Sequence, residues 1–343
     1  TPNPEHFPKG LKPVADAVHA AGMRFLLWVE PERVMKDTWL YENHRDWLLA
    51  PADLPKDLQY QKNDGFYLLN FGNPEALAWA KETFITLIRE TGIDIYRQDF
   101  NMTPLYFWRN GEDEDRRGMN EIRYIEGFYD FWDALQREFP GLLLDSCASG
   151  GRRIDFEVMR RALTLFRSDL CWEPLSEQSM NYGISFWMPI TGIGAVTMDP
   201  YAFQSGIGSH ISLALDYYRD WSWWAPAKAA MQRYQALRPL FTGDYYPLTP
   251  YSLAKDRWIA WQYHQPEKGE GLIQAFRREE CAETGQSLRV RGLDPAADYV
   301  VELGDGTPDQ TLSGAVLMQE GLPVTIAARP GSLLIHYRRA GGK

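Results

Sequence analysis

The chain has 343 residues, of which 45% are hydrophobic and 14% aromatic, and it carries a formal net charge of −10. This length suits one α/β barrel of ordinary size with a small second domain. The acidity disfavours nucleic acid as a partner, because phosphate binding needs a basic face. The three cysteines are widely spaced and form no C-x-x-C pair, which disfavours both a zinc site and a disulfide framework.

The sequence carries little information about the cellular location of the protein. The first ten residues contain no apolar signal-peptide core. No apolar run reaches the roughly 18 residues that a membrane span needs. We therefore expect a cytoplasmic protein without a membrane partner, although secretion stays open.

Helix and strand signals alternate over the first 240 residues or so. A helix is predicted over 10–21 and a strand over 23–30, which ends on acids. A helix begins at Asn73-Pro74-Glu75 and stops before Gly92. The later elements are a strand from 93 to Asp99, a helix over 119–138, a strand to Cys147, a helix near 155–162, a strand to Asp169, a strand within 206–215 and a helix over 226–238. The helix side expected to be buried in 10–21 comprises Leu11, Val14, Ala17 and Val18.

The alternation ends near Gly243, and turn residues then separate short β-rich segments. This pattern is typical of an antiparallel β-sandwich. We therefore predict a catalytic (β/α) domain over 1–243 and a β-sandwich over 244–343. The predicted strands of the second domain are 257–264, 271–277, 287–292, 298–303, 323–328 and 332–338.

Several of the predicted strands stop on a polar or acidic residue, which is how a parallel (β/α) barrel presents catalytic groups. Asp99 lies beside Arg97, and a carboxylate near a cation stays ionised. An ionised carboxylate facing an anomeric carbon is a suitable nucleophile. A structural ion pair with Arg97 is an equal alternative on this strand alone.

Asp169 is the natural partner of Asp99, because glycoside hydrolysis uses two carboxyl groups. One of them must be protonated, and an apolar setting raises a carboxyl pKa. Leu165, Phe166, Leu170 and Trp172 are the residues expected to supply that setting. A capping or loop role for Asp169 stays open.

Two other segments carry possible ligand contacts. The run Cys147-Ala148-Ser149-Gly150-Gly151-Arg152 lets backbone N–H groups approach a ligand oxygen. Asp155, farther along, suits a helix N-cap or an arginine partner better than catalysis. Glu30 and Glu32 follow Trp28, whose ring could stack on a sugar, although a solvated turn explains these acids equally well.

Four motifs in order resemble the retaining α-galactosidases of glycoside hydrolase family 36. They are WVEPE at 28–32, RQDFN at 97–101 as a variant of K-W-D-M-N, C-x-S-G-G-x-R-x-D at 147–155, and x-x-S-D at 166–169. The interval of 70 residues between Asp99 and Asp169 also suits that family. The resemblance covers roughly residues 8–240.

The resemblance implies a retaining glycosidase for α-galactoside oligosaccharides or glycoconjugates, without metal or organic cofactor. Asp99 would be the nucleophile and Asp169 the acid/base. Arg97 stands where the family has Lys, which leaves α-N-acetylgalactosaminidase or another α-glycosidase as alternatives. A non-catalytic carbohydrate-binding or scaffold fragment is the alternative of another class. The implied substrate-binding residues are Trp28, Glu30, Arg97, Asn101, Cys147, Gly150, Gly151 and Arg167.

The chain departs from the family at its start. It lacks the family's N-terminal β-domain and the first two barrel strands, the second of which ends in Asp-Asp-Gly-Trp. We therefore expect an incomplete TIM-type barrel of about six strands, followed by the β-sandwich. Open sheet edges need covering. The β-rich segment, a second copy of the chain or a complementing chain is expected to close the barrel.

Overall fold

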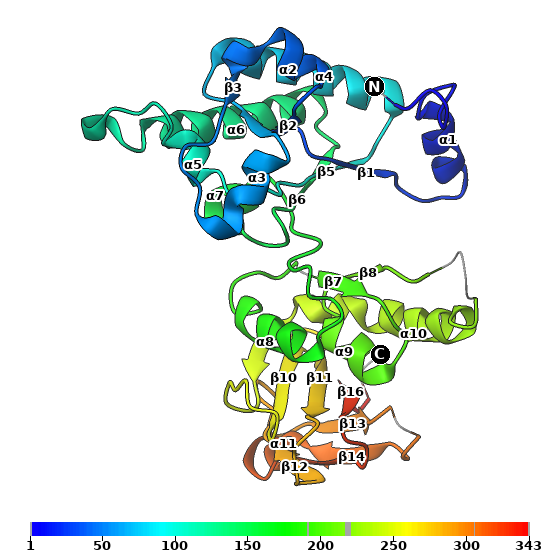
Figure 1. Cartoon of the computed structure of the whole chain (residues 1–343). Helices are drawn as coiled ribbons and strands as arrows, with labels where there is room; N and C mark the ends of the chain where they lie inside the picture. Colours follow the sequence, from blue (N-terminus) through cyan, green and yellow to red (C-terminus); the bar gives the residue numbers. More distant parts are fainter. Residues whose placement is uncertain (1, 191, 217–220, 305, 342–343) are drawn as a thin grey trace. The chain divides into compact units, whose positions relative to one another are not determined.

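The computed structural model describes residues 2–190, 192–216, 221–304 and 306–341 (Figure 1). The chain forms two compact units, Thr1–Thr164 and Leu165–Lys343, called here the first and second unit. The boundary predicted at 243/244 separates a (β/α) domain from a β-sandwich. It does not refer to these compact units, so it stays a prediction. Residues 217–224 form the aromatic-rich run YYRDWSWW, and its first four residues, 217–220, lie outside the described residues.

The first unit is built around three parallel strands, with β5 in the centre. In register, Trp28 of β1 lies beside Arg97 of β5, and Arg97 lies beside Asp145 of β6. Helices α4 and α6 pack against each other (Figure 1). Their buried apolar residues join the strand residues in one core. The bounds are β1 Leu26–Val29, β5 Ile95–Gln98, β6 Leu143–Ser146, α4 Pro74–Thr91 and α6 Met119–Glu138.

Local signals explain the ends of α4. The side chain of Asn73 accepts a hydrogen bond from the backbone N–H of Glu75, and Pro74 takes the first helical position. At the other end Gly92 has φ +70°, a left-handed conformation that favours glycine. Both predicted ends of this helix are confirmed.

Helix α1, Lys12–Ala20, lies where it was expected, but its predicted buried side does not hold. Ala15 is its only fully buried residue, whereas Val14 is 37% exposed. An apolar stripe becomes buried only where a neighbouring element covers it. Within the described residues the cover over this helix is therefore partial.

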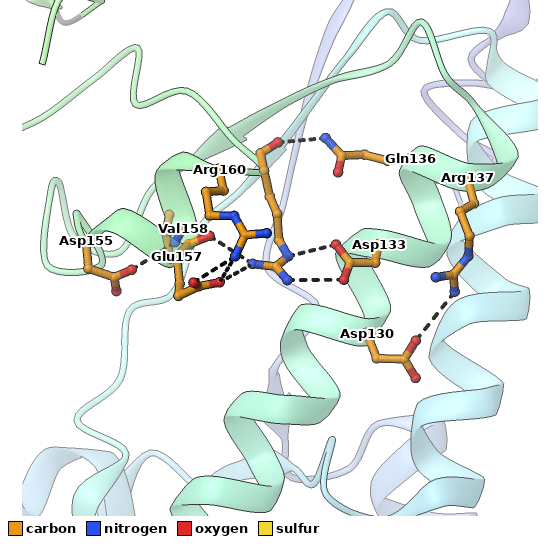
Figure 2. Close-up of polar contacts among 9 residues, drawn as sticks. Asp130, Asp133, Gln136, Arg137, Asp155, Glu157, Val158 and Arg160 are labelled. Atoms are coloured by element: carbon orange, nitrogen blue, oxygen red, sulfur yellow. Dashed lines mark hydrogen bonds and ion pairs between the residues drawn. The ribbon is translucent and has the colours of Figure 1, made fainter.

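The remaining elements of the first unit are short. An antiparallel sheet in the order β2-β4-β3 follows β1 and was not predicted. Helix α7 lies where a helix was expected, and Asp155 caps it by accepting from the N–H of Val158 at 2.8 Å (Figure 2). The bounds are β2 Arg33–Met35, β3 Leu48–Leu49, β4 Phe66–Leu69, α2 Trp39–Asn43, α3 Gln59–Asn63, α5 Leu105–Trp108, α7 Phe156–Met159 and the 3₁₀ helices Arg45–Trp47, Lys56–Leu58 and Glu114–Arg116.

Ion pairs tie α7 to α6. Arg161, just after α7, donates to both carboxylate oxygens of Asp133 on α6, at 2.7 and 3.2 Å. Gln136 of α6 donates to the backbone carbonyl of Arg161 (Figure 2). Both Arg160 and Arg161 also pair with Glu157 of α7 at the surface. The segment after β6 is thus fixed to α6, the helix that precedes β6 in the chain.

The first part of the second unit contains the parallel strands β7 and β8 and the helices α8, α9 and α10. The strand predicted within 206–215 and the helix predicted over 226–238 are both confirmed as β8 and α10. The bounds are α8 Pro174–Ile184, β7 Gly192–Ala195, α9 Pro200–Gly206, β8 His210–Leu213, α10 Trp224–Leu237 and the 3₁₀ helix Arg238–Thr242.

A six-stranded antiparallel sheet, ordered β14-β13-β16-β11-β10-β9, forms the C-terminal part of the second unit. Its central strands are buried on both faces: Trp261 packs into a cluster with helices, whereas Ala260 packs against the two-stranded β12-β15 sheet. The predicted antiparallel architecture is confirmed. The bounds are β9 Asp244–Pro247, β10 Trp258–Gln265, β11 Glu270–Arg277, β12 Gly285–Leu288, β13 Asp298–Glu302, β14 Gln310–Ser313, α11 Gly314–Gln319, β15 Leu322–Thr325 and β16 Gly331–Arg339.

The predicted strand that ends on Asp169 is wrong. In that segment Leu163 forms an isolated parallel bridge with Asp145, and residues 165–169 have no strand conformation. The described residues therefore contain five parallel strands of a (β/α) fold, three in one sheet and two in another, where about six were expected. Among the described helices, none has both the length and the apolar character needed to cross a bilayer.

Candidate active site

Most of the predicted site residues gather where β1, β5 and β6 end. Asp99 directly follows β5, and Trp28 lies on the edge strand β1. The turn after β6 carries Cys147, Gly150 and Gly151. Parallel strands present their carboxyl ends at one edge of a sheet, so these groups lie around the same carboxylate.

Both oxygens of Asp99 accept hydrogen bonds. Oδ1 accepts from the backbone N–H groups of Phe100 at 2.7 Å and Ser149 at 3.2 Å. Oδ2 accepts from the amide of Asn101 at 2.9 Å and the indole of Trp28 at 3.1 Å. Asp99 is 8% exposed, so the carboxylate is held in one orientation at the base of the site.

The hydrogen bonds decide the charge of Asp99. Burial raises the pKa of this carboxyl, but donors from Asn101, Cys147, Phe100 and Ser149 together outweigh burial and lower it below its usual value. Asp99 is therefore ionised at neutral pH. Burial raises the pKa of the Cys147 thiol to about 12, so this group stays protonated and acts as a donor.

The expected pairing of Asp99 with Arg97 needs correction. The Arg97 guanidinium forms an ion pair with Asp145 at 2.5 Å, across the neighbouring strand β6. Asp145 is 1% exposed and Arg97 13% exposed, so the pair is largely desolvated. The structural Arg–Asp pair that the sequence left open does exist, but its acid is Asp145.

The turn after β6 has an unusual backbone. Ser149 has φ +47°, a left-handed conformation that non-glycine residues seldom adopt, and Gly150 follows with φ +81°. This conformation directs the N–H of Ser149 at Asp99. The predicted approach of backbone N–H groups in this run is thus directed, in part, at a carboxylate of the protein itself.

Glu30 lies beside this site and is not a solvated turn residue. Its carboxylate accepts from the backbone N–H of Asn101 at 2.8 Å and pairs with Arg33. Burial raises the pKa of Glu30, and the contacts with Asn101 and Arg33 oppose that rise. Glu30 thereby holds the backbone next to Asp99.

Glu32 is fully buried and joins two motifs that are far apart in sequence. Arg153 donates to both its oxygens at 2.7 Å, and Gln98 donates at 2.7 Å. The Arg153 guanidinium lies 4.0 Å from the ring centre of Phe100 and 4.5 Å from that of Phe128. This pair fixes the end of β1 to the turn that carries Cys147.

The second unit holds the remaining predicted residues, Asp169 and Arg167. Asp169 is exposed and follows an irregular segment. The apolar setting expected for it is not formed, since Leu170 is 40% and Trp172 61% exposed. No strand forms over residues 165–169, so the segment before Asp169 lacks the alternating arrangement that would bury one of its sides.

Arg167 is buried and donates to Glu177 at 2.9 Å. Burial raises the pKa of Glu177 to about 7, and Arg167 opposes that rise. This pair ties the segment before Asp169 to helix α8.

Comparisons with known proteins identify the family. Residues 1–209 match the sequence model of the melibiase family, and residues 258–336 match that of the glycosyl hydrolase family 36 C-terminal domain. The chain belongs to glycoside hydrolase family 36. Alpha-galactosidase C of Emericella nidulans is 26% identical over 99% of this chain and 46% of its own length. An alpha-galactosidase of Escherichia coli is 33% identical over 56% of this chain and 25% of its own length.

Solved structures of family 36 enzymes share the fold. The alpha-galactosidase of Lactobacillus brevis superimposes with a TM-score of 0.86 at 23% identity, over 99% of this chain and 48% of that one. The alpha-galactosidase AgaA of Geobacillus stearothermophilus in complex with raffinose gives 0.84 at 22% identity, over 98% and 48%. This chain spans about half the length of the curated relatives it matches.

Sequence reasoning missed some residues that build the candidate site around Asp99. Gln98, Arg152 and Arg153 were not among the predicted site residues. In the structure, all three bond to groups that hold Asp99 or the strands around it. Arg153 lies within a recognised motif, which was the available signal. Within the described parts of the chain, no three His, Cys, Asp or Glu side chains are grouped to hold a metal ion.

Proposed function

We propose that this chain carries the nucleophile and the acid/base of a retaining α-galactosidase. The observation that supports the proposal best is the state of Asp99, which is ionised, oriented by donors on both oxygens and placed at the end of a parallel strand beside the exposed Trp28 ring. Membership in family 36 and relatives named alpha-galactosidases supply the reaction class.

The proposed reaction is a double displacement. Asp99 attacks the anomeric carbon of the galactoside while Asp169 protonates the departing oxygen. Asp169 then removes a proton from water while the water oxygen attacks the anomeric carbon, which breaks the bond to Asp99 and releases galactose with retained configuration. In a retaining enzyme the two carboxyl groups lie about 5.5 Å apart, and a crystal structure with bound galactose measures that separation.

Attack by Asp99 requires a lone pair on one of its oxygens. The longest contacts on the two oxygens are those from Ser149 at 3.2 Å and Trp28 at 3.1 Å. These contacts lengthen as the new bond forms, whereas those from Phe100 and Asn101 keep the carboxylate aimed. Trp28 is 49% exposed, so its ring is also open to the apolar face of a sugar.

The other predicted residues take supporting roles in this proposal. Cys147, Gly150 and Gly151 line the sugar site through the turn after β6. Arg97 and Glu30 form part of the wall of this site. Arg97 is held by Asp145, and Glu30 is held by Arg33. Arg167 supports the segment of Asp169 through Glu177.

The proposal includes a partner that completes the barrel. Within the described residues β1 pairs with β5 only, so its second edge is unpaired. An unpaired strand edge invites pairing with another chain. A second copy or a complementing chain takes that place. Light scattering measures the mass in solution, and a monodisperse monomer with full activity contradicts this part.

The test of the function is hydrolysis of nitrophenyl α-galactoside by the chain and two variants. Asp99→Asn and Asp169→Asn each remove one carboxyl without changing size, and each is expected to lower kcat by at least about a thousandfold. A greater activity on α-N-acetylgalactosaminide favours the alternative substrate. Galactose binding without turnover favours a non-catalytic carbohydrate-binding fragment.

A further inference from the structure

We propose that Arg152 is a positioning residue for Asp99, acting through Ser149 and Asn101 on the orientation of the nucleophile. This inference rests on the proposed function and deepens it. Arg152 lies in the run that sequence analysis singled out, but it is not one of the predicted site residues. It has no contact with Asp99, so its effect is carried by the groups between them.

The Arg152 guanidinium joins two loops. Its Nη2 donates to the carbonyl oxygens of Phe100 and Met102, both at 3.1 Å, in the loop after β5. Its Nε donates to the carbonyl of Ala148 at 2.9 Å, and Nη2 also donates to Ser149 Oγ at 2.9 Å, in the turn after β6. One planar side chain thus fixes the distance between the two loops that surround Asp99.

A chain of hydrogen bonds runs from Arg152 to the nucleophile. With Arg152 donating to its oxygen, the Ser149 hydroxyl donates to Asn101 Oδ1 at 2.7 Å. That contact sets which way the Asn101 amide faces, so its Nδ2 points at Asp99 Oδ2 at 2.9 Å. Hydrogen bonds in such a chain polarise and strengthen one another.

Arg152 also supports the backbone of Ser149. The left-handed φ of +47° places the Ser149 N–H 3.2 Å from Asp99 Oδ1, and such a conformation persists only where its surroundings hold it. Arg152 bonds to the carbonyl before Ser149 and to its side chain. Without Arg152, both of the Asp99 donors that involve Ser149, one direct and one through Asn101, lose their support.

The experiment compares Arg152→Met with Arg160→Met in the full chain. Both arginines are exposed, but Arg160 bonds to Glu157 on the surface of α7 (Figure 2). Selective ¹³C labelling of aspartate, with Asp99→Asn to assign the signal, gives the pKa of Asp99 by NMR. The same proteins are assayed for kcat and KM across pH.

We expect the pKa of Asp99 to rise in Arg152→Met, because Asn101 and Ser149 are among the donors that lower it. The acid limb of the rate profile moves to higher pH with it, and kcat falls about ten- to a hundredfold with little change in KM. Arg160→Met leaves all of these unchanged. Guanidinium ion added to Arg152→Met restores part of kcat.

An unchanged pKa of Asp99 in folded Arg152→Met overturns the positioning role, whether or not the chain is active. A fall in kcat without any shift of the acid limb also overturns it, since a general loss of structure would produce that result. If the unmodified chain is inactive but the pKa rises in Arg152→Met, the positioning role stands and the proposed function fails. The two proposals are therefore tested separately.

Discussion

Replacing Arg153 by Met tests whether a buried ion pair holds the site together. Glu32 is 0% exposed and Arg153 13% exposed, and the guanidinium donates to both carboxylate oxygens at 2.7 Å. Arg153→Met leaves the Glu32 charge buried, with only Gln98 and Tyr124 bonded to it among the contacts described. Removing one partner of such a pair costs about 3–5 kcal/mol.

The loss of stability in Arg153→Met comes mainly from the buried Glu32 charge, which is left without a partner cation, and less from the lost attraction between the two groups. Replacing both partners by apolar residues removes that charge, so Glu32→Met combined with Arg153→Met is expected to be more stable than Arg153→Met alone by about 1–3 kcal/mol. Arg160→Met, which breaks an exposed pair, is the matched control and is expected to cost far less than Arg153→Met.

The assay has to report on the first unit alone, because a chain of two units need not unfold in a single step. Hydrogen–deuterium exchange of peptides that cover β5 and β6, read by mass spectrometry, gives the free energy of opening at the site. A loss below about 1 kcal/mol in Arg153→Met refutes the reasoning. So does a double variant whose loss equals the sum of the two single losses.

Three further predictions concern stability. Because the pKa of Glu177 is raised to about 7 from 4.5, the folded chain holds a proton that the unfolded chain releases in this range. This contribution to the free energy of unfolding is full below about pH 4.5 and is lost as pH rises to about 7. Glu177→Gln should abolish this pH dependence, measured by urea titrations at several pH values; the same pH dependence in both proteins contradicts the prediction. Asp155→Ala should cost about 1 kcal/mol through the α7 cap and Asp155→Ser much less; equal losses in urea unfolding contradict the cap. Gly92→Ala should cost about 1 kcal/mol at φ +70°, and an unchanged melting temperature contradicts it.

The sequence predicts the parts of the fold that local chemistry determines. Helix α4 has a cap at Asn73 and a left-handed Gly92, so both of its ends can be read from neighbouring residues. The antiparallel sheet β2-β4-β3 has strands of two to four residues, too short for a periodic pattern to reveal. The strand predicted before Asp169 has a suitable composition, but tertiary context leaves it irregular.

The candidate site divides in the same way. The position of Asp99 after its strand is a local property, and the sequence predicts it correctly. The partner of Arg97 is not local, because Asp145 lies 48 residues away on a neighbouring strand. The contact between Glu32 and Arg153 spans 121 residues, and no spacing rule connects them. Long-range pairing of this kind becomes visible only in the folded chain.

Trapping the covalent intermediate tests the central claim most directly. A fluorinated galactoside with a good leaving group slows the second displacement, so the sugar stays on the nucleophile. Proteolysis and mass spectrometry then locate the label. We predict one galactosyl group per active chain, on the peptide that contains Asp99, and none in Asp99→Asn. A label on another carboxylate, or turnover without any covalent species, contradicts the assignment of Asp99 as the nucleophile.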